Sequence, residues 1–178
     1  MISKRYYGTQ IGFSLIEILI SLLILSIGLL GLGGLQLSSL KSANNAHFRT
    51  VASLAATDLV DRMRANPLAV ANNNYAASLN IQHCDTSLAK VCEAANECSA
   101  EDLAKYDLYR VNCGVSKGTN QTGGVQYDLP QAELIISCAV PPCTAGAEHS
   151  IRVSWKEADG DDADDDVQAR SYELSFIP

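Results

Sequence analysis

The stretch Gly12-Phe13-Ser14-Leu15-Ile16-Glu17 begins an apolar run that continues to about Leu40. Glu17 is the only charged residue between Arg5 and Lys41. A charged side chain in a bilayer costs roughly 2.5–3.5 kcal/mol on membrane-insertion scales, so this carboxylate needs a partner. A cut before Phe13 would create one, because a free α-amino group titrates near about 7.7–8.0 and is largely cationic at neutral pH. We therefore expect cleavage between Gly12 and Phe13.

Residues 1–12 form a short polar leader that contains Lys4 and Arg5 and no acidic residue. Positive charge before an apolar segment keeps that end in the cytoplasm, so the chain should cross the membrane once and place its remainder on the other side. A secretory signal has an apolar region of ~7–15 residues that ends in a small-x-small site, and this run has neither property. A lipoprotein signal needs a cysteine, and none precedes Cys84. A plain membrane anchor would leave Glu17 unexplained.

One long helix is predicted from Phe13 to about Asn66, because the first proline is Pro67 and proline ends helices. Residues 13–40 are apolar on nearly all sides and form the expected transmembrane or fibre-core half. Residues 41–66 form an amphipathic half, with apolar side chains at helical spacing. The predicted apolar face consists of Val51, Leu54, Ala55, Leu59 and Met63.

Four glycines interrupt the apolar run, at Gly28, Gly31, Gly33 and Gly34. Each costs about 1 kcal/mol relative to alanine inside a helix. They either let neighbouring helices approach closely, as small residues do in membranes, or mark a stretch that loses its helix on assembly. The sequence leaves both interpretations open.

All six cysteines follow the apolar run. An even number beyond a membrane segment predicts disulfides in an oxidising compartment. Buried thiols or a zinc site are the alternatives, but zinc sites usually repeat a C-x2-4-C pair, and here only Cys138-x4-Cys143 comes near this pattern. These two could close a small loop, and the other four then allow three connectivities. The disulfide candidates are Cys84, Cys92, Cys98, Cys113, Cys138 and Cys143.

The last third of the chain alternates apolar and polar residues in three segments, around Leu134, Val153 and Leu174. This period of two predicts an antiparallel meander with one buried face, which should cover the amphipathic half of the helix. The predicted fold class is α+β, with residues 67–178 as a disulfide-stapled globular domain. Before the meander we expect a helix from Ala100 to about Tyr109, capped by Ser99. Residues 68–79 are expected to form a connecting loop with a short helical turn, and residues 84–98 and 115–124 are expected to be loops.

Most of the net charge of −7 comes from six aspartates within residues 159–166. The acidity is local, and we expect no nucleic-acid partner. Clustered carboxylates with a glycine suit calcium, but the EF-hand order is absent. A solvated loop that keeps a sheet edge from pairing is the favoured interpretation. The weak calcium candidates are Asp159, Asp161, Asp162, Asp164, Asp165 and Asp166.

The N-terminal stretch resembles the class III signal of type IV pilins, with Gly12 before the cut, Phe13 after it and Glu17 five residues into the mature chain. The resemblance implies a pilin fold, a long helical spine packed against a small antiparallel sheet. It also implies that a prepilin peptidase cuts after Gly12 and methylates the amine of Phe13. Glu17 would then pair with such an amine and set the register between subunits in a fibre.

Other stretches resemble the PilV family of minor pilins, the pilus modification proteins: residues 27–32, Leu35-Gln36, residues 102–108, Leu129-Pro130, Ser154-Trp155 and Ser175-Phe176. The match is strong in the anchor and patchy beyond it. It implies a low-abundance subunit that helps to initiate the fibre, with other minor pilins, the major pilin and a tip adhesin as partners. The chain would first cross the inner membrane once, with its C-terminal domain in the periplasm. It would then enter the pilus fibre, at its tip, and take part in pilus biogenesis, adhesion or motility.

Two alternatives remain. The minor pseudopilin of type II secretion systems shares the leader and a related domain, but it is usually smaller and has fewer cysteines. A membrane-anchored periplasmic enzyme would need a catalytic constellation, whereas His47, His83 and His149 are isolated in the sequence and no Ser or Cys motif accompanies them. We therefore expect neither enzymatic activity nor a cofactor.

Overall fold

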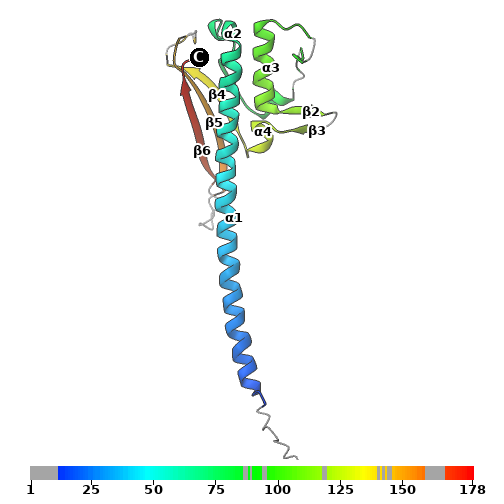
Figure 1. Cartoon of the computed structure of the whole chain (residues 1–178), viewed down its shortest axis with the longest axis vertical. Helices are drawn as coiled ribbons and strands as arrows, with labels where there is room; N and C mark the ends of the chain where they lie inside the picture. The colour runs from blue at the N-terminus through cyan, green and yellow to red at the C-terminus, as the bar shows by residue number, and fades with distance from the viewer. Residues whose placement is uncertain are drawn as a thin grey trace, which may run out of the picture. The chain divides into compact units, whose positions relative to one another are not determined.

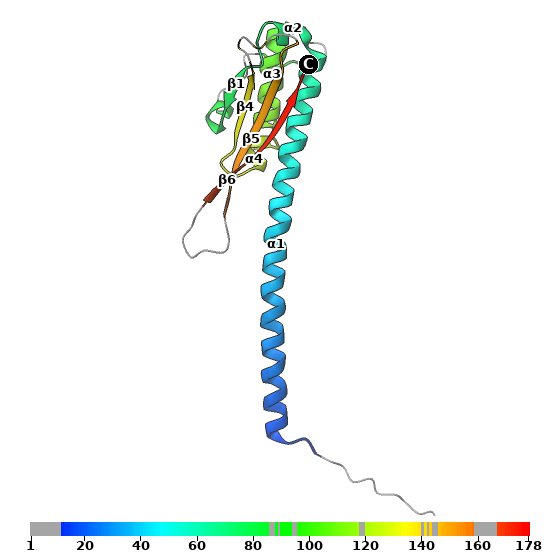
Figure 2. The ribbon, with the colours of Figure 1, turned by 90° about the vertical axis from the view of Figure 1, so that its left-hand side faces the viewer.

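The computed structural model describes residues 12–85, 88, 90–93, 96–117, 120–139, 141, 143, 146–158 and 167–178. The leader up to residue 11 and the acidic stretch 159–166 lie outside the described residues. The chain divides into two compact units, residues 1–43 and residues 44–178, which we describe separately. Figures 1 and 2 show the helices and strands of the second unit from two directions.

Helix α1 spans Leu15–Ala65 and is 51 residues long. Its end lies within a residue of the prediction, because the next residues start a separate short helix, α2 (Pro67–Ala71). Asn66 caps α2 by accepting a hydrogen bond from the backbone N–H of Ala69 at 3.4 Å. Pro67 at the first position of α2 has no N–H to donate, which suits a helix start and prevents α1 from continuing.

The buried face of α1 differs from the predicted one at Leu54, while Val51 and Ala55 are partly buried against the core as predicted. Leu59 and Met63 are fully buried as expected, but Leu54 is 64% exposed. Ala52 and Ala56 instead form the contact, because their small side chains let neighbouring elements approach closely. Leu54 lies two residues from each of them, about 200° around a helix of 3.6 residues per turn, so it points away. The buried residues of α1 are Ala52, Ala56, Leu59, Val60 and Met63.

The meander predicted for the last third of the chain is confirmed. It consists of β4 (Glu133–Cys138), β5 (His149–Ala158) and β6 (Val167–Phe176), and β1 (Ala77–Leu79) joins it at one edge. All neighbours are antiparallel, in the order β1-β4-β5-β6. The sequence analysis missed β1, because three residues are too few to show an alternating pattern.

The core of the second unit lies between the sheet and α1. Trp155, Ile151 and Val153 of β5 are buried, as is Leu134 of β4, and they belong to one apolar cluster with the buried face of α1. The sheet therefore covers the amphipathic half of the helix, as the alternation predicted. This arrangement of a helix with a four-stranded antiparallel sheet is α+β and consistent with a pilin fold.

Helix α3 spans Ala100–Cys113 and begins with the predicted cap: Ser99 Oγ accepts from the N–H of Asp102 at 3.1 Å. It extends beyond the predicted end and stops at Gly114. The remaining elements of this unit are the 3₁₀ helix η1 (Ile81–Cys84), the strands β2 (Val115–Lys117) and β3 (Asn120–Thr122), and α4 (Val125–Asp128). Strands β2 and β3 form a hairpin where only a loop was predicted.

Gly114 is required where α3 meets this hairpin, because its φ is +74° and a Cβ would lie 2.3 Å from the carbonyl oxygens of Thr122 and Gly123. We expect Gly114→Ala to lower the free energy of unfolding by about 2–4 kcal/mol, from backbone strain and overpacking together. Gly123→Ala is a matched control, since Gly123 has the same φ and nothing within 4 Å of its Cβ position. Urea unfolding of the detergent-solubilised chain should show the larger loss for Gly114→Ala, and equal losses would refute the steric argument.

Candidate functional site

Gly12 and Phe13 lie in a short non-helical segment before α1. Phe13 is 81% exposed. A Cβ on Gly12 would meet no atom within 4 Å, and its φ is outside the left-handed region. Packing of the described residues therefore does not require glycine at this position, and any demand for a small residue would come from a molecule that binds here.

Glu17 lies in the first turn of α1 and is exposed. Its backbone N–H donates to Ser14 O at 3.1 Å, and its carbonyl accepts from Ser21 Oγ at 2.7 Å. A carboxylate in the first turn of a helix interacts favourably with the helix dipole. We find no hydrogen bond or ion pair to the Glu17 carboxylate within the described part of the chain.

The first unit contains the one stretch of the described chain that is long and apolar enough to cross a membrane, and none of its side chains in that stretch is buried. The four glycines belong to this stretch. A Cβ at Gly28, Gly31, Gly33 or Gly34 would meet nothing within 4 Å. Contacts among the described residues therefore do not explain them, and both interpretations given above involve contacts with other molecules or a change on assembly.

The structure joins the six cysteines in three disulfides, Cys84–Cys113, Cys92–Cys98 and Cys138–Cys143. The last is the small loop that the sequence analysis singled out. The first links η1 to the end of α3, and the second closes a loop directly before α3. Each removes conformational freedom from the unfolded chain, which typically contributes about 2–4 kcal/mol to stability.

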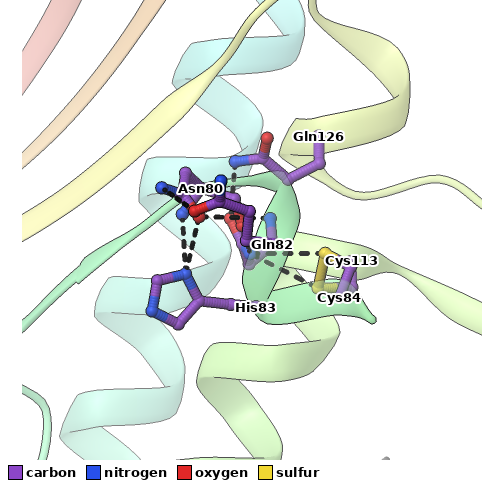
Figure 3. The surroundings of a disulfide bond; sticks show 7 residues. Asn80, Gln82, His83, Cys84, Cys113 and Gln126 are labelled. Atoms are coloured by element: carbon purple, nitrogen blue, oxygen red, sulfur yellow. Dashed lines mark hydrogen bonds between the residues drawn. A yellow bond between two sulfur atoms is a disulfide. The ribbon is translucent and has the colours of Figure 1, made fainter. Parts of the chain in front are cut away.

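Figure 3 shows why η1 and α3 meet at the Cys84–Cys113 disulfide. Asn80 caps η1, and its N–H donates to His83 Nδ1 at 3.1 Å. The buried Asn112 of α3 donates from Nδ2 to Asn80 O at 3.2 Å. His83 is thus part of a helix cap, which is a structural role.

The other two histidines are in different surroundings. His149 is buried, and its Nδ1 lies 2.8 Å from Ala147 O, whereas His47 is exposed on α1. The described residues contain no group of three or more His, Cys, Asp or Glu side chains arranged to hold a metal ion. The six aspartates considered for calcium lie outside the described residues.

A buried polar network was missed by the sequence analysis. Asp107 of α3 accepts from Arg62 Nη1 at 2.9 Å and from the Tyr75 hydroxyl at 2.8 Å. Asn66 Nδ2 lies 3.3 Å from the same hydroxyl and donates to Ala100 O at 2.8 Å. Burial, and then the hydrogen bond to Asp107, raises the pKa of Tyr75 well above its ordinary value. The network ties the end of α1 to α3.

Comparison with protein families finds two similarities. Residues 34–109 match the Tt1218-like family, described as Type IV pilin Tt1218, and residues 9–33 match the prokaryotic N-terminal methylation motif. Together they support a class III signal pilin with an N-methylation motif. No curated protein and no solved structure shows a significant match.

Proposed function

We propose that this chain is a minor pilin of the PilV type, which is inserted in the inner membrane, cleaved after Gly12 and methylated on Phe13. The observation that carries the proposal is the methylation-motif match over residues 9–33. It spans the cleavage stretch and Glu17, and it ends inside the apolar part of α1. A secreted enzyme or a plain anchor would need none of these residues.

In this proposal the chain has four parts. Residues 1–12 are the leader removed by the prepilin peptidase, and residues 13–40 are the transmembrane segment that later enters the fibre core. Residues 41–66 are the amphipathic half of α1, which supports the globular domain, residues 67–178. Three disulfides within this last part suit a domain that folds in the periplasm.

Glu17 would form an ion pair with the α-amino group of Phe13 that cleavage after Gly12 creates. An α-amino group is largely cationic at neutral pH, and the two charges lie about one helical turn apart in the sequence. In a fibre the amine of one subunit would meet the carboxylate of its neighbour, which sets the axial register. The exposed apolar side chains of the first unit would pack against the major pilin and other minor pilins. A tip adhesin would bind to the same group of minor pilins.

Mass spectrometry of the mature N-terminus tests the proposal. We expect a chain that begins at N-methylated Phe13 in cells with an active prepilin peptidase. Replacing Gly12 with valine should leave the leader attached, because a branched side chain blocks a site built for glycine, although packing within the chain tolerates the change. A wild-type chain that still begins at Met1 would refute the proposal.

A further inference from the structure

Strand β6 is a long, open edge of the sheet. It pairs with β5 along its whole length of ten residues and has no strand on its other side. Within the described residues, no backbone hydrogen bond outside that ladder involves β6. A long edge of this kind is a template for another strand, and proteins usually blunt such edges.

The ladder shows which backbone groups of β5 are already used on the β4 side. The N–H of Lys156 donates to Pro130 O at 3.0 Å, and Glu148 O accepts from the N–H of Ala139 at 3.1 Å. In an antiparallel ladder, successive residues direct their N–H and C=O groups to opposite sides of the strand. The even-numbered residues of β5 therefore face β4, and the odd-numbered residues face β6.

The same alternation identifies the free groups of β6. Trp155 is paired with Arg170 and Val153 with Tyr172, so the even-numbered residues of β6 bond to β5. The odd-numbered residues direct their N–H and C=O groups outward, away from the sheet. These residues are Val167, Ala169, Ser171, Glu173 and Ser175.

The side chains leave this edge accessible. Ala169, Ser171 and Ser175 are small and exposed. The Glu173 carboxylate is held over β5, where Ser150 Oγ donates to it at 2.5 Å and Arg152 Nη2 at 3.0 Å. The carboxylate therefore does not cover the outward backbone groups of β6. The hydrogen bond from Ser150, and then that from Arg152, lowers the pKa of Glu173.

The face of β6 that packs on the core is not fully buried. Tyr172 and Leu174 are only partly buried against the core. A strand added beside β6 would place alternate side chains next to these two and shield their apolar surface further. The occupant should therefore be an extended segment with apolar side chains on one face.

The direction of β6 restricts what can pair with it. In both views the β6 arrow points toward the end of the unit where α1 terminates (Figures 1 and 2). The guanidinium of Arg64, near the end of α1, lies 5.9 Å from the ring centroid of Phe176 at the end of β6. An antiparallel pair of two β6 strands would therefore turn the two copies of residues 44–65 of α1 in opposite directions, whereas neighbours that lie parallel in one assembly keep these helical parts in the same direction.

The opposite edge of a neighbouring sheet does satisfy this restriction. Because all neighbours are antiparallel in the order β1-β4-β5-β6, β1 runs opposite to β6. If a neighbour of the same fold has its α1 parallel to this one, the strand at its β1 edge is antiparallel to β6. In this chain β1 has only three residues, and Ala77 and Leu79 bond to β4, which leaves the outward groups of Ser78. A second copy of the chain would satisfy little of the β6 edge.

We propose that β6 docks the edge strand of a different pilin-like subunit, one whose strand at the β1 position is long and exposed, so that the two sheets continue into one. The mode is β-strand addition, in which main-chain hydrogen bonds supply the affinity. The contact is between unlike edges and so orders the neighbours. The inference rests on the proposed function, because it takes the partner from the same assembly.

A proline at Ser171 tests the edge directly. Ser171→Pro removes an outward N–H and leaves the β5 ladder intact, since proline is tolerated where the N–H of an edge strand faces solvent. Ser171→Ala is the matched control, because it removes the same hydroxyl and keeps the N–H. A benzoylphenylalanine photo-crosslinker at Ser175 of the full-length chain, in membranes of cells that produce the whole assembly, reports what lies beside β6. The same probe at Ser78 reports the opposite edge.

We expect the Ser175 probe to form an adduct with another chain that carries an N-terminal methylation motif, through a peptide from its sheet edge. The yield should fall about tenfold or more in Ser171→Pro, as loss of one or two hydrogen bonds predicts, and stay within about twofold in Ser171→Ala. The Ser78 probe should not capture that peptide. Equal yields in the two variants, an adduct with a second copy only, or no adduct would each overturn the proposal.

Two further measurements keep the result interpretable. Circular dichroism and disulfide mapping in detergent test whether Ser171→Pro is folded. If Ser171→Pro is not folded, Ala169→Pro is used in its place, because it removes another outward N–H of the same strand. The N-terminal mass is measured in the same cells. An uncut chain refutes the proposed function, whereas a cut chain whose adduct survives Ser171→Pro refutes only the docking of a strand at β6.

Discussion

Replacing Asp107 with alanine is expected to lower the free energy of unfolding by about 3–5 kcal/mol, because the buried Tyr75 hydroxyl and one nitrogen of the Arg62 guanidinium both lose their acceptor. The Asp107 carboxylate is buried and accepts from Arg62 and Tyr75 at 2.9 Å and 2.8 Å. Without it the hydroxyl of Tyr75, itself 1% exposed, loses its acceptor. Arg62 keeps only its exposed partner, Asp58, at 3.0 Å. The end of α1 and α3 would then lose the contact that fixes them together.

Glu101→Ala is the control for this prediction. Glu101 is an exposed acid on the same helix, and among the described residues it forms an ion pair only with Lys105, four residues further along. Exposed pairs of this spacing contribute about 0.3–0.5 kcal/mol, so urea unfolding of the detergent-solubilised chain should hardly change. If Asp107→Ala unfolds at the same urea concentration as Glu101→Ala, the network does not hold the two helices together.

The network around Asp107 could not have been predicted from sequence patterns. Arg62 and Asp107 lie 45 residues apart and Tyr75 and Asp107 lie 32 residues apart. No periodicity or local motif links positions so distant, and each residue is ordinary in its own segment. The pairing exists because α2 and the following turn bring Tyr75 back beside α3. From the sequence this region was predicted to be a connecting loop with a short helical turn, which says nothing about what Tyr75 contacts.

Elements with their own repeating signal were predictable. The long helix follows from the absence of proline before Pro67, the α3 cap from Ser99, and the meander from alternation in β4, β5 and β6. The failures were at elements whose identity depends on tertiary contacts. Leu54 was misplaced because Ala52 and Ala56 have little apolar surface and yet are fully buried in the core. The β2–β3 hairpin lacks apolar alternation, so only its pairing defines it.

The N-terminal segment shows the opposite relation between sequence and structure, a clear sequence pattern with few contacts. Gly12, Phe13 and Glu17 have a strong sequence pattern, and the described residues supply no packing or polar contact that would explain it. A pattern without an internal structural reason suggests selection by other molecules, here a processing enzyme and neighbouring subunits. The free edge of β6 is different again, because it is invisible in the sequence and follows from the topology.

Glu17→Gln is expected to remove the chain from assembled fibres while leaving membrane insertion and cleavage unchanged. Glutamine keeps the size and polarity of the side chain and removes only the charge that would pair with the amine of Phe13. Leaving one member of a buried ion pair without its partner costs on the order of 3–5 kcal/mol. At about 1.4 kcal/mol per tenfold change, that corresponds to a loss of incorporation of roughly a hundredfold or more.

Quantitative immunoblots of sheared fibres and of membranes would measure this loss, with the N-terminal mass checked in both variants and the wild type. Gln36→Leu is the control, because Gln36 is another polar residue of the apolar stretch and carries no charge. Its replacement should not reduce incorporation of the chain into fibres. A Glu17→Gln chain that is cut at Phe13 and appears in fibres at the wild-type level would show that the carboxylate does not set the register. Loss of the chain from the membrane as well would point to insertion as the role of Glu17, because the charge would then act before any subunit contact.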